Sequence, residues 1–224
     1  SRVLDPSQPQ IRQENEQALS LKITDLAAQD ARAVYKNTNY DLRQYKRLQL
    51  FTHAEAPQLD VNDLADGDLA VFIRLGSDYK NNYYEYEVPL KLTPHGEYNY
   101  NNSEHQKIVW PAENMLNFRL EILTDLKLER NREKRSGTNG VSFQTVSSGR
   151  DPDNDGNTIR VKGNPSLSEV KTVMIGVRNV RNKLKSGEVW VNELRLTDFN
   201  EEGGWAANAN LNVALSDLGT VNVG

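Results

Sequence analysis

The chain of 224 residues contains no cysteine, only two methionines and only three histidines. The absence of cysteine excludes disulfides, thiolate nucleophiles and metal sites with cysteine ligands. Long apolar runs are absent as well, since none approaches the roughly 18 residues that a membrane-spanning helix needs. The N-terminal sequence SRVLDPSQPQ is polar and contains proline, so we expect no signal peptide there.

Neither sign of charge dominates the sequence. It has 27 basic and 31 acidic residues, a net charge of −4 at pH 7, and no strongly basic stretch. Nucleic-acid binding depends on lysine and arginine side chains that displace the counterions of phosphates, so we expect no nucleic-acid partner. Glycine-rich phosphate loops of the GKS and GxGxxG types are also absent, which removes the usual signature of a nucleotide enzyme.

Apolar and polar residues alternate along several short segments, which is the pattern of half-buried strands. Segments 69–75 and 84–92 flank a polar turn and predict an antiparallel hairpin, in which Pro89 should lie on a sheet edge or at a bulge. Further strands are expected at 19–23, 48–52, 173–177 and 189–196, and one helix over 110–135. Because strands do not alternate with helices, the predicted fold is all-β with one helix: an antiparallel jelly-roll or galactose-binding-like β-sandwich.

Composition divides the chain into three parts. Residues 1–17 are polar and predict an arm or linker, and residues 18–200 predict the sandwich domain. Within the sandwich, strict alternation places Trp190, Leu194 and Leu196 on one face, and we expect that face to be buried with the apolar residues of 173–177.

Residues 203–224 form the third part and have a different chemistry. Apolar residues occupy the odd positions and asparagines the even ones, without the lysine or glutamate that protects a soluble edge strand from pairing with other sheets. A transmembrane β-strand of about 9–11 residues has this alternation, with an aromatic residue at the interface. The segment therefore predicts a barrel strand and turn with a membrane-facing row: Trp205, Ala207, Ala209, Leu211, Val213 and Leu215. Without barrel neighbours, it should be disordered or pair with an edge of the sandwich or of another copy.

Two groups of side chains are candidates for binding. Asp151, Asp153 and Asp155 precede a glycine as in the first half of a calcium loop, but position twelve is Lys162 instead of glutamate, so a solvated turn is the competing interpretation. The tyrosine cluster, with Tyr83, Tyr84 and Tyr86 at its centre, could stack on sugar rings or nucleobases, or could simply cover an edge of the core.

Other polar residues give no catalytic pattern. The three histidines, His53, His95 and His105, are far apart and are expected on the surface or in loops. Glu85 and Glu87 project from one side of a strand, as on a solvated face. We therefore expect no enzyme activity and no cofactor, with calcium as the one alternative.

The C-terminal stretch EVWVNELRLTDFNEEGGWAANANLNVALSDLGTVNVG resembles the SprA (Sov) family. The resemblance rests on Trp190, on residues 192–199, on 203–207 and on 217–220. Membership would imply a fragment of a far longer protein: the outer-membrane translocon subunit of type IX secretion and gliding motility in Bacteroidota. The family resemblance implies a giant β-barrel that exports folded proteins, with soluble domains between its strands, and other secretion-system subunits and secreted cargo as partners. It supplies no catalytic residues.

Two further functions stay open on the residues alone. A carbohydrate-binding module of a surface protein is one, because many sugar-binding sandwiches end in a strand like GEVWVNELRL and the tyrosines offer stacking surface. An enzyme is the other, and only the aspartate triplet and the isolated histidines support it.

Overall fold

The computed structural model describes residues 18–99, 101–138, 140–199, 211–213 and 219–223, and most of them belong to two antiparallel sheets. Sheet A contains β1 (Leu19–Leu26), β3 (Tyr45–Glu55), β6 (Leu116–Arg119), β10 (Lys185–Phe199) and β11 (Leu211–Val213). Sheet B contains β2 (Ala31–Tyr40), β4 (Leu69–Gly76), β5 (Tyr83–Pro89), β7 (Ser147–Asp151), β8 (Asn154–Lys162), β9 (Val170–Asn179) and β12 (Gly219–Val223).

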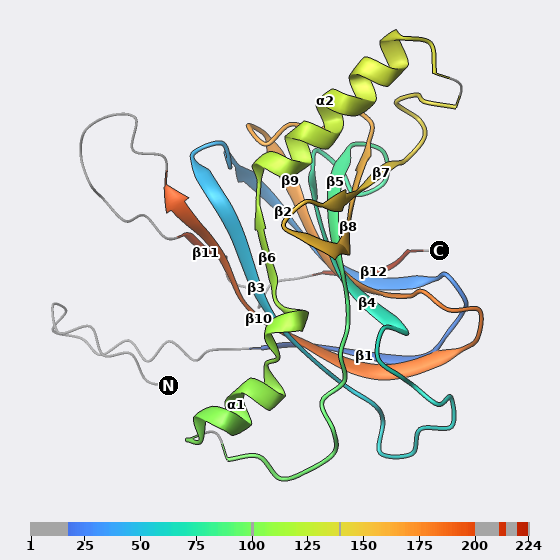
Figure 1. The fold of residues 1–224 in the computed structure, drawn as a ribbon, viewed down its shortest axis with the longest axis vertical. Helices are drawn as coiled ribbons and strands as arrows, with labels where there is room; N and C mark the ends of the chain where they lie inside the picture. The colour runs from blue at the N-terminus through green and yellow to red at the C-terminus, as the bar shows by residue number, and fades with distance from the viewer. Residues whose placement is uncertain (1–17, 100, 139, 200–210, 214–218, 224) are drawn as a thin grey trace, which may run out of the picture.

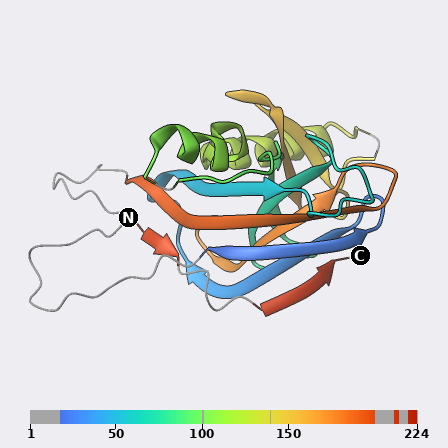
Figure 2. The ribbon, with the colours of Figure 1, turned by 90° about the horizontal axis from the view of Figure 1, so that it is seen from below.

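The strand orders show how the two layers form. Sheet A has the order β1-β10-β3-β6, with β11 also paired to β10, and sheet B the order β12-β2-β9-β4-β5-β8-β7. The sheets pack as the two layers of a sandwich (Figures 1 and 2). The prediction of an all-β antiparallel sandwich is therefore confirmed. No helix within the described ranges is long and apolar enough to cross a membrane.

One large apolar core fills the space between the sheets. Alternate residues of β4, such as Val71 and Ile73, belong to the same buried cluster as Val189 and Val191 of β10. The rings of Tyr86 on β5 and Phe118 on β6 stack at 3.9 Å, which joins sheet B to sheet A. Burial of each such side chain contributes about 1.5–3 kcal/mol, so this core supplies most of the stability.

The helix predicted over 110–135 is only partly correct. Its second half is α2 (Glu121–Arg135), which buries Ile122, Leu123 and Leu126 against β6 on one side and β7 and β8 on the other (Figure 1). Its first half contains a 3-10 turn (Ala112–Asn114) and the strand β6, whose Leu116 and Phe118 pair with β3. Two apolar residues in so short a segment agree with a helical spacing as well as with a strand. The pairing with β3 is what makes residues 116–119 a strand.

Three features were not predicted from the sequence. They are β2, the β7–β8 hairpin and a short helix, α1 (Ser103–Val109), whose N-cap Asn102 accepts a hydrogen bond from the backbone N–H of Glu104. The hairpin of β4 and β5 is confirmed. Pro89 is the exposed last residue of β5, beyond the pairing with β8, so the expected edge position is wrong: β5 is an interior strand that ends at its proline.

The predicted burial of Trp190 is also wrong. Trp190 is half-buried on the outer face of sheet A, whereas its two neighbours in β10 are fully buried. At Glu193 the backbone has a φ of 53° and the register with β3 shifts. This β-bulge inserts one residue, so that Leu194 and Leu196 return to the core while Trp190 stays outside.

Candidate functional site

The three central tyrosines are in the interior and offer no stacking platform. Tyr84 and Tyr86 face the core, and the Tyr84 hydroxyl donates to the carbonyl of Pro165 at 3.1 Å. Tyr83 lies on the opposite face of β5, covered by the guanidinium of Arg74 at 4.2 Å from the ring centroid. Burial raises the pKa of Tyr84 to about 12 and raises that of Tyr86 as well. Tyr83, Tyr84 and Tyr86 therefore form no stacking platform, and the sugar-binding alternative loses these three residues as stacking surface.

The aspartate triplet does not converge on one point. Asp151 is buried, and its carboxylate accepts hydrogen bonds from the Tyr86 hydroxyl at 2.6 Å and from the backbone N–H of Asp153. The Asp153 side chain turns outward to Arg119 at 2.9 Å, and Asp155 is exposed. Within the described residues no group of three or more acidic, histidine or cysteine side chains could hold a metal ion. The triplet instead closes the hairpin between β7 and β8.

We expect millimolar calcium to leave the melting temperature of the chain unchanged. A bound ion would stabilise the fold by RT ln(1 + [L]/Kd), but Asp151 and Asp153 already have protein partners. Thermal melting monitored by circular dichroism, with and without calcium, tests this. An increase of several degrees that disappears in Asp153→Ala would contradict it.

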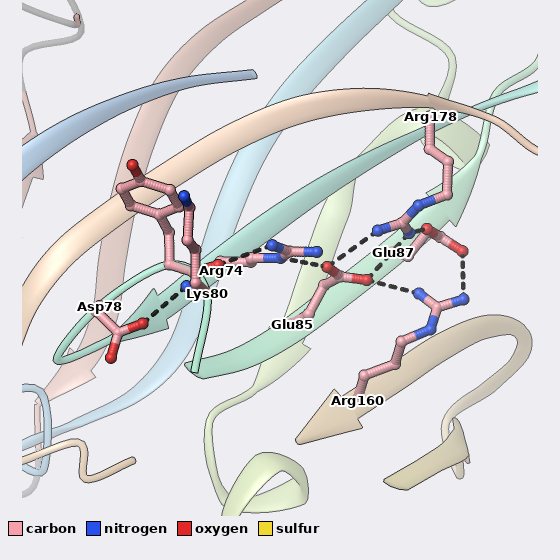
Figure 3. A network of polar contacts seen from close by, with 8 residues as sticks. Arg74, Asp78, Lys80, Glu85, Glu87, Arg160 and Arg178 are labelled. Atoms are coloured by element: carbon pink, nitrogen blue, oxygen red, sulfur yellow. Dashed lines mark hydrogen bonds and ion pairs between the residues drawn. The ribbon is translucent and has the colours of Figure 1, made fainter. Parts of the chain in front are cut away.

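A network of buried ion pairs occupies the outer face of sheet B, the face turned away from the core (Figure 3). Glu85 on β5 is completely buried and forms ion pairs with Arg74 on β4 at 2.6 Å and Arg160 on β8 at 2.7 Å. Arg178 on β9 lies 3.0 Å from the same carboxylate and also pairs with Glu87, as does Arg160. The expectation that Glu85 and Glu87 form a solvated face is wrong, because arginines from three neighbouring strands cover them.

The side chains of Arg74 and Arg178 also cover an aromatic ring. Phe72, on the same face of β4, is fully buried, with the guanidinium of Arg178 at 4.7 Å and that of Arg74 at 5.3 Å from its centroid. The ring lies over Gly176 of β9, where an added Cβ would come within 2.4 Å of it. The face is therefore a tightly packed structural layer around Phe72 and Gly176.

The charge of Glu85 makes the stability of the fold dependent on pH. Burial alone raises the pKa of this carboxyl, but Arg178, Arg74 and Arg160 outweigh burial and lower the pKa from 4.5 to about 2. A lowered folded-state pKa gives stability that is present above the unfolded value and is lost as the pH falls through the folded one. We expect this one residue to remove about 3 kcal/mol from the free energy of unfolding between about pH 4.5 and pH 2. Urea titrations at a series of pH values measure the loss, and the same slope in Glu85→Gln would contradict the assignment.

A groove opens on the outer face of sheet A. It has a volume of about 1710 Å³ and is bounded by β1, β3, β10, the segment 56–61 and the segment 94–110 with α1. Trp190 on β10 and Trp110 after α1 are half-buried in it. The β-bulge in β10 leaves Trp190 on the outer face. The bulge that makes the predicted register wrong therefore also places an aromatic ring on the floor of this groove.

His53 organises the floor of the groove. Contrary to expectation it is buried, and its ring lies 4.7 Å from that of Trp190 and 6.0 Å from that of Trp110. Its Nδ1 is 2.7 Å from the carbonyl of Val109 and 3.1 Å from the hydroxyl of Thr93, which ties the segment after α1 to the sheet. His95 and His105 line the same groove without joining this cluster. The alternation of apolar and polar residues is the same whether an outer-face histidine is buried or solvated. The sequence therefore did not predict the burial of His53.

Two short strands from the C-terminal segment pair with the sandwich. Residues 211–213 (β11) extend sheet A beside β10, and residues 219–223 (β12) pair with β2 at the edge of sheet B. Both belong to the predicted barrel segment, and pairing with the sandwich is one of the outcomes expected in the absence of barrel neighbours. Trp205, Ala207, Ala209 and Leu215 lie outside the described residues, as do residues 1–17.

The described part of the chain is thus an antiparallel β-sandwich with one tightly packed outer face and one grooved outer face, which defines it by class as an all-β sandwich domain. Comparison with protein families gives a match to SprA_N, described as motility related/secretion protein, over residues 1–224. The chain belongs to this family, which confirms the resemblance seen in residues 190–220. No curated protein matches the sequence.

Proposed function

We propose that this chain is a non-catalytic soluble domain of a giant outer-membrane β-barrel translocon that exports folded proteins, in type IX secretion and gliding motility. The family match over residues 1–224 is the observation that carries the proposal. The fold is compatible with it, because an antiparallel sandwich with its own large core can be inserted between barrel strands and still fold as a unit. Its partners are then secretion-system subunits and secreted cargo, and its location is the outer membrane.

Residues 203–224 are, in this proposal, part of the barrel wall. A strand in hydrocarbon needs a neighbour for every backbone N–H and C=O, since each unpaired group costs several kcal/mol. The pairing of β11 and β12 with β10 and β2 supports the idea that this segment takes an extended conformation and accepts sheet neighbours. In the parent protein, barrel strands would take the place of the sandwich edges.

The experiment is a comparison of two strains, each with one substitution in the parent protein. Val191→Asp puts a charge into the core, where Val191 is fully buried, and Leu184→Asp makes the same kind of change on an exposed loop residue. The proposal predicts that Val191→Asp abolishes gliding and leaves secreted proteins inside the cell, whereas Leu184→Asp has neither effect. Normal secretion and gliding in the Val191→Asp strain, with the protein present at its usual level, would contradict the proposed function.

A further inference from the structure

Two carboxylates from neighbouring strands line the groove on sheet A. Glu188 of β10 and Glu55 of β3 are direct cross-strand partners on the outer face. Like charges in directly opposite positions destabilise an antiparallel pair. Neither carboxylate forms an ion pair with a lysine or arginine of the described residues, although Lys22 is the cross-strand partner of Glu188 on its other side. Lys22 contributes to the lowered pKa of Glu188 without a direct ion pair, so each carboxylate can still accept a direct contact from a further positive charge.

Each carboxylate is held by the aromatic floor and keeps one oxygen available. Oε1 of Glu188 accepts hydrogen bonds from the indole N–H of Trp190 at 2.7 Å and from the hydroxyl of Ser20 at 2.8 Å. These bonds lower the pKa of Glu188, which is therefore ionised at neutral pH. Oε2 of Glu55 lies 3.4 Å from Nε2 of His53. The remaining oxygens, Oε2 of Glu188 and Oε1 of Glu55, have no hydrogen-bond partner within the described part of the chain.

Aromatic rings surround the place where a cation would lie. Trp190 and Trp110 flank His53, and both indoles keep part of their surface open to the groove. A guanidinium or ammonium over an indole gains about 0.5–1 kcal/mol when exposed and more when desolvated. Carboxylates beside indole faces are thus suited to arginine and lysine side chains.

The size and rim of the groove indicate a chain segment as the occupant. Its volume of about 1710 Å³ is larger than the roughly 300–1,000 Å³ of pockets for small ligands. Leu59 and Val61 on its rim are each 87% exposed, which provides apolar contacts beside the charged centre. The lining has four carboxylates and two lysines, so acidic groups are in excess, and one of the lysines, Lys107, already pairs with Glu104 at 2.8 Å.

We propose that this groove binds an extended, basic segment of a partner protein, with a lysine or arginine side chain held between Glu55 and Glu188 against Trp190. The inference rests on the groove and its charges, and it is independent of the membrane role proposed for residues 203–224. It assigns the grooved face of the sandwich to partner binding and the face with the buried ion pairs to structure.

Isothermal titration of the chain with a synthetic peptide tests the proposal. The probe is an end-blocked pentapeptide of alternating leucine and arginine, and the control peptide carries citrulline, a neutral isostere, in place of arginine. We expect measurable binding of the arginine peptide and an affinity at least tenfold lower for the citrulline peptide, because a charge-assisted bidentate contact is lost. In Glu55→Gln/Glu188→Gln the arginine peptide should also bind at least tenfold more weakly, whereas Glu169→Gln, an exposed acid paired with Lys171, should leave binding unchanged.

Thermal melting separates a binding role from a structural one. Glutamine can keep the hydrogen bonds of Glu188 and removes the like-charge pair, so Glu55→Gln and the double variant should melt at or above the temperature of the unchanged chain. Equal affinity for the two peptides, or full affinity of the arginine peptide for Glu55→Gln/Glu188→Gln, would overturn the proposal. Binding of a neutral oligosaccharide such as maltohexaose in place of the peptide would also overturn it, since the groove would then be a sugar site.

Discussion

Replacing Glu85 by glutamine is expected to lower the free energy of unfolding by about 3–5 kcal/mol. Glu85 is completely buried and is the common partner of Arg74, Arg160 and Arg178. Without its charge, three desolvated guanidinium groups face one another with Glu87 as the remaining carboxylate. Equilibrium urea denaturation at pH 7 measures the loss directly.

Two further variants place this result in context. Glu169→Gln removes the same charge from an exposed pair with Lys171 and should change stability by less than about 1 kcal/mol. Arg178→Gln added to Glu85→Gln should recover part of the loss, because it relieves the repulsion among the guanidinium groups. A loss below 1 kcal/mol in Glu85→Gln would mean that water enters the network and that Glu85 is not the centre of the outer layer.

Arginine at position 211 of the parent protein is expected to abolish export. On the lipid face of a barrel strand near the middle of the membrane, the substitution costs about 2–4 kcal/mol, and Leu211 belongs to the predicted lipid-facing row. Arginine at position 210, one residue earlier, would point into the aqueous lumen and should be tolerated. Export is measured as the amount of secreted protein at the cell surface, with the level of the parent protein in the outer membrane as a second readout.

The pair Leu211→Arg and Asn210→Arg is matched in position, residue and charge. A barrel wall predicts that only the first variant loses assembly and export. If both strains export normally, or if both fail to the same extent, the segment is not a membrane strand with this orientation.

Sequence periodicity predicted the strands in which apolar side chains alternate regularly, as they do in β1, β3, β4, β5 and β9. The β4–β5 hairpin is the clearest case, because its alternation and polar turn agree with its pairing. Periodicity failed at β6, a short strand inside an apparently helical pattern, because pairing with β3 decides its conformation. It also failed at the bulge in β10, where the residue with a positive φ is Glu193 and not the glycine or asparagine that would signal it.

The functional faces were harder to predict for a related reason. Glu85 and Glu87 alternate like a solvated face, and only their partners on other strands reveal that they are buried. Arg74, Arg160 and Arg178 occupy outward positions of their own strands, so a correct strand order would have suggested the network. The groove depends on the bulge that turns Trp190 outward and on a loop folded over β3, and neither has a local signature in the sequence.

Cysteine labelling of the C-terminal segment in the parent protein tests whether this sandwich leads into the wall of an outer-membrane barrel. Single cysteines at positions 207–212, a segment without cysteine, are introduced one at a time, treated with a water-soluble maleimide in intact membranes and compared with the parent protein that lacks the introduced cysteine. The account predicts labelling with a period of two: positions 208, 210 and 212 react, while 207, 209 and 211 react only with a membrane-permeant reagent. Equal reaction of odd and even positions with the water-soluble reagent would contradict it.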